Sequence, residues 1–361
     1  MKLLTLKHTN MKKILFAALA ALAITSCSQN EEIDAPAQKA EIKFNTAVSK
    51  ALRANTTTNA NFTQFKAYAY SNSEDFENAT SSFNSLINGE KFEKNGENWA
   101  VTDKTFYWPK TDKVSFFAYS LTTDNATWEA PTIATPNAAP QLTYTVATTA
   151  ATQEDLLVSE KMNQTSTTSA TNLVFQHALT KIGFKIKGTG KNVTYTVTEL
   201  SVTAKDKGTY TYKADATNPS NILGSWQVAS DATSQTYTLL TSAPDDDITI
   251  AVTETESINE SLITPNTADN NSTKSILMLI PQELTNVSIN IKYKAEITDG
   301  GELYDLTATG ETLKFPTSNS WDAGKALVYT LVLSPGENLQ LTGSTSDSWD
   351  LTEGGTPSIN K

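Results

Sequence analysis

Residues 287–297 read Val-Ser-Ile-Asn-Ile-Lys-Tyr-Lys-Ala-Glu-Ile, and nearly every second side chain in this stretch is apolar. Alternation with a period of two puts successive side chains on opposite faces of a β-strand, so the stretch predicts a strand with one buried face. The same pattern begins at residues 42–48, where Ile42, Phe44 and Val48 are separated by polar or small residues. The alternation predicts β-structure near both ends of the chain.

Nine further stretches have the composition of strands and are separated by clusters of Gly, Pro, Asn, Asp and Ser. They are residues 65–70, 114–119, 141–146, 181–187, 193–202, 209–213, 248–252, 275–280 and 326–333. Many short strands with such punctuation are typical of antiparallel β-sandwiches. Short helices are expected only around residues 76–86 and 153–158, so the predicted fold class is all-β.

The composition agrees with this fold class and excludes others. The chain has 361 residues, a length that favours two domains. Of these residues 56 are threonine, whose branched Cβ suits strands better than helices. The net charge of −11, with no basic cluster, argues against binding to nucleic acid. The 13 Phe, 12 Tyr and 6 Trp residues are enough to anchor two cores, so extensive disorder is not expected.

The N-terminus has the form of an export signal. Two lysines precede an apolar run at residues 14–24, which is too short to span a bilayer. The run ends in Ile-Thr-Ser-Cys, which is similar to a bacterial lipobox, and Cys27 is the only cysteine in the chain. Acyl chains such as palmitate on Cys27 would anchor the protein to a membrane. We expect a lipoprotein signal peptide at 1–26 and a tether at 27–40. A free thiol after an ordinary signal peptide is the alternative.

The only arginine, Arg53, follows the strand predicted at 42–48. The residues after it, 54–61, are mostly polar, and an extended polar loop suits proteolysis. A cut after Arg53 would release residues 27–53, which include the anchor and the first strand. Loss of a strand exposes backbone groups and an apolar groove, which a strand of another molecule can fill. A solvated arginine without a role is the alternative.

The remaining residues give no pattern for catalysis. We find no supported Ser-His-Asp pattern, phosphate loop or zinc spacing, so we expect no enzyme activity, no cofactor and no metal. His177 lies in an apolar stretch and is expected to be structural. The three aspartates at 245–247 are expected to form a turn, with a calcium site as the alternative. The six tryptophans are expected to fill cores, with a sugar-stacking platform as the alternative.

Several motifs occur in order along the chain. They are Phe-Tyr-Trp-Pro at 106–109 with the strand at 114–119, Asp-Leu-Leu-Val at 155–158, residues 173–182, Leu-Ile-Pro-Gln at 279–282, and Trp-Asp-Ala-Gly-Lys at 321–325. Together with the lipobox they make the chain similar to the fimbrillin (Mfa-like) family of Bacteroidetes pilus proteins. The resemblance implies two tandem transthyretin-like antiparallel β-sandwich domains. We place these domains at 41–178 and 179–361, with a candidate donor strand beginning at 339–342.

The resemblance also implies a function. It implies a structural fimbrial subunit that is exported as an outer-membrane lipoprotein, cut by an arginine-specific protease, and polymerised with other fimbrial subunits by β-strand exchange. Cys27 then carries the lipid and Arg53 is the processing site. The expected location is the cell surface, first at the outer membrane and then in the fimbrium. A pilus-tip adhesin, or a surface lipoprotein that binds a host protein or glycan, is the alternative.

Overall fold

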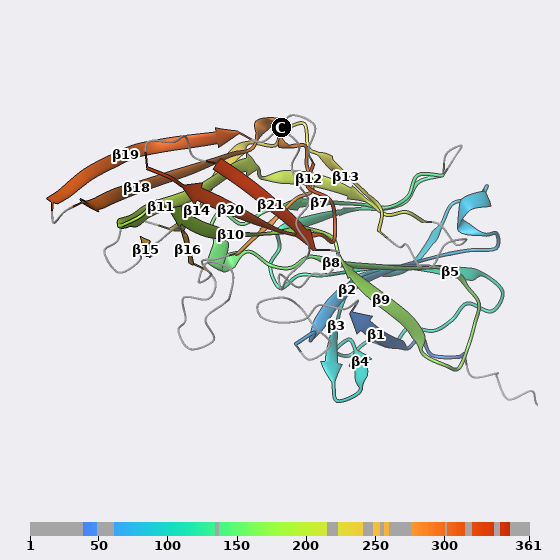
Figure 1. Cartoon of the computed structure of the whole chain (residues 1–361). Helices are drawn as coiled ribbons and strands as arrows, with labels where there is room; N and C mark the ends of the chain where they lie inside the picture. The colour runs from blue at the N-terminus through green and yellow to red at the C-terminus, as the bar shows by residue number, and fades with distance from the viewer. Residues whose placement is uncertain are drawn as a thin grey trace, which may run out of the picture. The chain divides into compact units, whose positions relative to one another are not determined.

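The computed structural model describes residues 39–48, 61–133, 137–214, 223–240, 248–252, 256–259, 276–299, 302–314, 320–335 and 340–346. Cys27, Arg53 and the aspartates at 245–247 lie outside these ranges. The chain divides into two compact units, residues 1–39 and 40–361, and the description below concerns the second. Its described residues form 21 strands and three short 3-10 helices (Figure 1), which confirms the all-β prediction. No described helix is long and apolar enough to cross a membrane.

The elements up to residue 177 are nine strands and two 3-10 helices. They are β1 Phe44–Val48, β2 Gln64–Asn72, η1 Phe76–Asn78, β3 Asn84–Asn95, β4 Asn98–Ala100, β5 Lys113–Ser120, β6 Ala126–Glu129, β7 Gln141–Thr145, η2 Ala150–Thr152, β8 Leu157–Gln164 and β9 Thr171–His177. The elements that follow are twelve strands and one 3-10 helix. They are β10 Thr180–Thr189, β11 Val193–Lys205, β12 Lys207–Thr211, β13 Ser225–Val228, β14 Ser234–Leu240, β15 Ile248–Val252, β16 Glu256–Asn259, β17 Ile276–Leu279, η3 Leu284–Asn286, β18 Ser288–Asp299, β19 Glu302–Lys314, β20 Ala326–Leu333 and β21 Gln340–Ser346.

All eleven predicted strands are present, and β15 and β20 have the predicted bounds. Of the two short helices expected, the first is confirmed only as the single 3-10 turn Phe76–Asn78, and the second is wrong. Only the single turn η1 forms near 76–86, and residues 153–156 have no regular structure before β8. The Ala-Thr-Ser-Ser run after η1 contains weak helix formers. Phe76 instead packs on Phe83 and Phe117, which holds this turn against the core.

The strands form four sheets. One has seven strands in the order β1-β9-β8-β5-β2-β3-β4, and one has four in the order β13-β12-β7-β6. The other two have five strands each. Their orders are β16-β10-β20-β21, with β17 also paired to β10, and β14-β11-β18-β19, with β15 also paired to β11. Most pairs are antiparallel, and the exceptions among the described strands are β1 with β9 and β10 with β20.

The seven-stranded sheet separates two apolar clusters. Along β2, Phe65, Ala67 and Ala69 belong to a cluster that we call the roll core, whereas Tyr68 and Tyr70 belong to a larger core that extends to Leu333. The period-two alternation of the strand causes this division. The buried members of the roll core are Ile42, Phe44, Val48, Phe62, Phe65, Ala67, Ala69, Ile87, Phe92, Trp108, Val114, Phe116, Ala118, Leu157, Leu173 and Phe175.

The seven-stranded sheet is curled around the roll core. In a flat sheet, β1 and β3 would lie about 24 Å apart, because five spacings of about 4.8 Å separate them. The rings of Phe44 on β1 and Phe92 on β3 are only 5.0 Å apart between centroids. β1 also contacts β4, which is the strand at the other end of the order. The first strand of the described residues therefore closes the roll.

Residues on either side of the predicted boundary at 178 share structure. β7 and β12 pair over five residues, from Thr145 with Lys207 to Gln141 with Thr211. The larger core likewise contains buried side chains from both predicted domains. The division into domains at 41–178 and 179–361 stays a prediction.

Candidate functional site

The segment 40–48 presents one apolar face to the roll core. Ile42, Phe44 and Val48 are 4%, 3% and 7% exposed, whereas Lys43 and Asn45 between them are exposed. The alternation predicted from the sequence therefore corresponds to an inner and an outer face of a real strand. The inner face places three apolar side chains in the roll core.

Phe44 occupies a cage of three phenylalanine rings. Its ring lies edge-on to Phe65, Phe92 and Phe116, with centroids 5.8, 5.0 and 5.4 Å away and interplanar angles of 78°, 85° and 90°. The positive edge of one ring against the negative face of another is the favourable aromatic arrangement. The three rings come from β2, β3 and β5, so one side chain ties the opening strand to three others.

Two stretches of backbone, which we call edges, hold this segment: residues 106–108, which form an isolated bridge with it, and the strand β9. On one edge, the Ile42 amide donates to the Phe106 carbonyl at 2.8 Å and the Trp108 amide donates to the Ala40 carbonyl at 2.9 Å. An antiparallel bridge between Glu41 and Tyr107 lies between these bonds. This edge therefore binds residues 40–42, the first part of the segment.

The other edge belongs to β9, which runs parallel to β1 (Figure 1). The register runs from Phe44 opposite Thr171 to Val48 opposite Phe175, and the Thr171 amide donates to the Lys43 carbonyl at 2.7 Å. On the outer face, the side-chain amide Nδ2 of Asn45 donates to the side-chain oxygen Oδ1 of Asn172 at 3.2 Å. The segment thus bridges two edges that do not pair with each other along it.

Residues 40–48 therefore fill a groove formed by the two backbone edges and the roll core. Burial of an aliphatic or phenylalanine side chain contributes about 1.5–3 kcal/mol, so the three inward side chains together hold the segment firmly. Without residues 40–48, the two backbone edges and the roll core would lose their cover.

The sequence predicted the strand at 42–48 but not the residues that surround it. The phenylalanine cage and the edge at 106–108 come from segments far apart in sequence. The motif Phe-Tyr-Trp-Pro at 106–109 was the one available signal, and it supported the resemblance rather than a contact with residues 40–42. Cys27 and Arg53 lie outside the described residues, so lipidation and cleavage stay predictions.

His177 has a structural environment, as predicted. It ends β9 and is 4% exposed, and its Nδ1 lies 2.9 Å from an oxygen of the buried Asp155. The pair connects the end of β9 to the segment before β8. Among the described residues, no group of three or more His, Cys, Asp or Glu side chains is placed to hold a metal ion.

The described tryptophans fill cores, as predicted, rather than form a platform. Trp108 and Trp321 are 2% and 1% exposed. Trp99, Trp128 and Trp226 are half-buried and pack against the two clusters. Trp128, for example, stacks on Tyr68 with centroids 3.8 Å apart. Trp349 lies outside the described residues.

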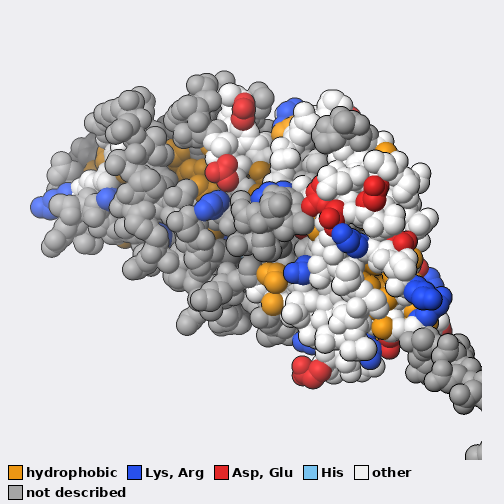
Figure 2. All heavy atoms as spheres, turned by 90° about the vertical axis from the view of Figure 1, so that its right-hand side faces the viewer, with side chains coloured by type: hydrophobic (Ala, Val, Ile, Leu, Met, Phe, Trp, Pro, Cys, Tyr) orange, Lys and Arg blue, Asp and Glu red, His pale blue; other side chains and the backbone are white. Residues whose placement is uncertain are grey.

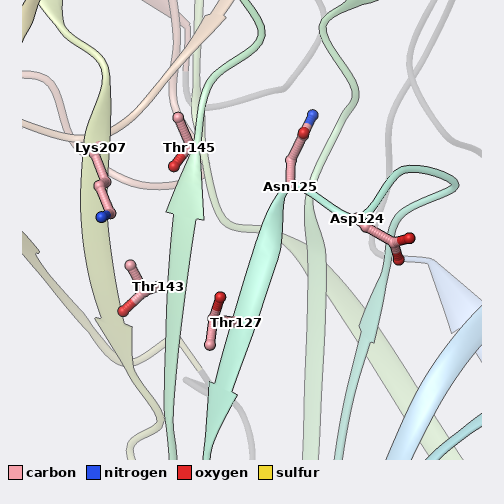
Figure 3. A pocket seen from close by; sticks show the side chains of 6 residues that line it. All are labelled: Asp124, Asn125, Thr127, Thr143, Thr145 and Lys207. Carbon is pink, nitrogen blue, oxygen red and sulfur yellow. The ribbon is translucent and has the colours of Figure 1, made fainter.

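A polar hollow of about 410 Å³ lies on the outer face of the four-stranded sheet (Figure 3). It is lined by Asp124, Asn125, Thr127, Thr143, Thr145 and Lys207. Lys207 Nζ lies 2.6 Å from Asp231, and Asp124 lies 3.3 Å from Lys66, so both charges are compensated. The hydrogen bond from Lys207 lowers the pKa of the exposed Asp231 carboxyl. The hollow therefore offers mainly neutral hydroxyl and amide groups.

The described surface carries charges of both signs. On the face drawn in Figure 2, lysine and carboxylate side chains are interspersed over uncharged surface. The ion pairs in the described residues are mostly exposed, as in Lys91 with Glu93 and Lys292 with Glu199. Such pairs contribute little to stability, so the fold depends on its apolar clusters.

The fold and the groove define an all-β protein whose opening strand completes a curled sheet. The family model described as fimbrillin-like matches residues 52–349, and the chain belongs to this family. Membership confirms the resemblance and places the protein among fimbrial subunits and adhesins of the cell surface. The match begins after β1. No curated protein matches the chain.

A solved structure supports the fold. A fimbrial protein from Bacteroides vulgatus superposes with a TM-score of 0.55 at 16% identity, covering 85% of this chain and 99% of that chain. The fimbrial anchor protein Mfa2 from Porphyromonas gingivalis is also similar, with a TM-score of 0.35 at 8% identity, covering 85% of this chain and 96% of its own. At 16% identity, the likeness to the Bacteroides vulgatus protein concerns the fold alone.

Proposed function

We propose that this protein is a structural fimbrial subunit that polymerises by exchanging its opening strand. In this proposal the chain is exported as a lipoprotein through Cys27 and is cut after Arg53. The released segment 27–53 then leaves with β1, and a strand from another subunit takes its place. The protein has no catalytic role in this assembly.

The observation that supports this proposal best is the way in which residues 40–48 are held in the fold. The segment is buried on one face and hydrogen-bonded along two separate edges. It is also the first described segment of the chain, so a single cut after it would end its covalent connection to the fold. The only arginine stands five residues after β1. A tightly held segment stays in place after cleavage until a replacement competes for the groove.

An arginine-specific protease tests the proposal, because the chain offers it one site. The substrate is the chain from residue 27, produced with Cys27→Ser so that it carries no lipid. We expect cleavage after Arg53 to yield filaments by electron microscopy and ladders in non-denaturing gels. The matched control is Arg53→Lys, which this protease leaves intact and which should stay monomeric. Persistent monomers after complete cleavage would contradict the proposal.

Lipidation is tested separately in cells. We expect the full chain to incorporate a palmitate label and to fractionate with the outer membrane, and Cys27→Ser to do neither. Label retained by the Cys27→Ser variant would place the lipid elsewhere or make the lipobox prediction wrong.

The hollow on the four-stranded sheet supports a second candidate function, adhesion through a glycan. Its hydroxyl and amide lining suits an uncharged saccharide, whereas the described tryptophans are largely buried and unsuited to a stacking platform. A glycan array is the test. We expect any binding to weaken in Thr143→Val, which keeps the strand shape but removes a hydroxyl, and to persist in the control Thr236→Val on β14. Flat binding curves would exclude this function.

A further inference from the structure

We propose that the groove selects its occupant by sequence, through a nine-residue pattern anchored by one aromatic side chain. Numbered from residue 40, the pattern has an apolar residue at position three, an aromatic residue at position five and an apolar residue at position nine. This inference rests on the proposed strand exchange and specifies the partner. The partner segment is an extended stretch of a second polypeptide with these three anchors.

The aromatic position follows from the phenylalanine cage. Phe44 makes three edge-to-face contacts at 5.0–5.8 Å, and each such pair is favourable beyond simple burial. An aliphatic side chain of similar size would fill the space without this electrostatic term. A residue truncated to alanine would leave a cavity enclosed by three rings. The cage therefore sets the register of the occupant.

The length follows from the two edges. Residues 40–42 hydrogen-bond to the edge at 106–108, whereas residues 43–48 pair with β9. A five-residue occupant matched to β1 would leave three groups without their present partners: the amide of Thr171 on β9, the carbonyl of Phe106 and the amide of Trp108. Unpaired backbone groups in a partly buried groove are unfavourable. The occupant must therefore span about nine residues to cover both edges.

The outward positions carry little selectivity. Lys43 is exposed, and its ion pair with Glu41 at 3.5 Å joins two half-exposed side chains. Such surface pairs contribute little. The identity of an occupant should therefore change freely at its outward positions and hardly at all at its three anchors.

Peptide exchange on the full mature chain tests this pattern. The chain from residue 27 with Cys27→Ser is cut after Arg53 and mixed with labelled peptides, and exchange is followed by native mass spectrometry and fluorescence polarisation. The reference peptide has the sequence of residues 40–48. We expect the Phe44→Ala peptide to bind at least about 100-fold more weakly. We expect the Lys43→Ala peptide to bind within about threefold of the reference, and the peptide 44–48 to exchange far less.

A double-mutant cycle assigns the selectivity to the cage. In the unaltered protein the Phe44→Leu peptide should bind about tenfold more weakly than the reference. In the variant Phe92→Leu, which keeps the position apolar but removes its ring, this difference should shrink severalfold because one aromatic pair is gone. Since the peptide substitutions leave the protein unchanged, they test the pattern even if Phe92→Leu folds poorly.

The outcomes separate this inference from the proposed function. If the reference peptide exchanges but the Phe44→Ala peptide binds equally well, the sequence pattern is wrong and strand exchange stands. If the reference peptide itself never enters the cut protein, residues 40–48 are not replaceable, and both the exchange and the pattern are overturned.

Discussion

Phe44 belongs to a five-residue strand, yet its ring touches side chains from β2, β3 and β5. A single residue can connect so many strands because the sheet curls and brings them around one point. The side chain of its neighbour Lys43 points outward and makes a surface ion pair with Glu41. At the scale of the residue, the contacts that hold the opening strand in the fold come mainly from its inward side chains.

The buried tyrosines of the larger core give a prediction about alkaline pH. Burial raises the pKa of Tyr329 to about 12, and it raises the pKa values of Tyr210 and Tyr212 further. Above pH 10 the unfolded chain releases these protons while the folded chain retains them. The free energy of unfolding should therefore be steady up to about pH 10 and then fall, by about 1.4 kcal/mol per pH unit for each buried tyrosine.

Urea unfolding between pH 8 and 11 measures this effect, with tyrosinate absorbance as a second signal. Tyr212→Phe is the matched variant. It should lose about 1 kcal/mol at neutral pH because the Tyr212 hydroxyl donates to the Ala118 carbonyl at 2.9 Å. Its stability should then fall less steeply above pH 10. An unchanged alkaline slope in this variant would show that Tyr212 does not contribute.

At the scale of the element, β10 packs unusually closely on β11. A Cβ added to Gly188 would lie 2.8 Å from a ring carbon of Tyr195 and 3.0 Å from a methyl of Val252. We expect Gly188→Ala to lower the free energy of unfolding by about 1–3 kcal/mol, because neither the ring nor the methyl lies at the free end of a flexible chain. Gly188→Val should be worse. Urea denaturation measures both.

Gly96 is the control for this prediction, because a side chain added there is unfavourable through backbone conformation and not through packing. It lies in the turn between β3 and β4 with φ of 62°, and an added Cβ would meet nothing within 4 Å. Gly96→Ala should lose about 1 kcal/mol through its backbone conformation alone. Gly96→Asn should recover most of this loss, because Asn tolerates the left-handed region. A Gly188→Val variant that is no less stable than Gly188→Ala would contradict the packing argument.

The last described strand, β21, pairs with another strand of the same chain. The sequence predicted a candidate donor strand beginning at 339–342. In the structure, Gln340–Ser346 is β21 and pairs antiparallel with β20 of the same chain, from Gln340 opposite Val332 to Ser346 opposite Ala326. A donor role for this segment would require that pairing to be given up. The donor strand stays a prediction.

At the scale of the whole molecule, the shared sheet predicts cooperative unfolding. β7 and β12 pair across the predicted boundary at 178, and the larger core draws side chains from both sides of it. We expect urea unfolding of the chain from residue 27 to show one transition, with tryptophan fluorescence and far-ultraviolet circular dichroism coinciding. Two separated transitions would instead support independent domains at 41–178 and 179–361.

Much of the fold could be predicted because alternation is a local property. The strands at 248–252 and 326–333 have the predicted bounds, since their apolar side chains recur at every second position or fill a buried run. β3 was missed because most of its side chains are polar and exposed, as in Asn84, Ser85 and Lys91. Its neighbours β2 and β4 hold such a strand through the backbone. Local patterns carry no signal for this.

The sequence alone determined that this is an all-β protein, that residues 42–48 form a strand with one buried face, and that Cys27 and Arg53 are each unique. It could do so because side-chain period and composition need no knowledge of distant neighbours. Only the tertiary structure decided that this strand bridges β9 and the edge at 106–108 and inserts Phe44 among three rings. Those contacts join residues up to about 130 positions apart, and the curl of the sheet that creates them is a property of seven strands together.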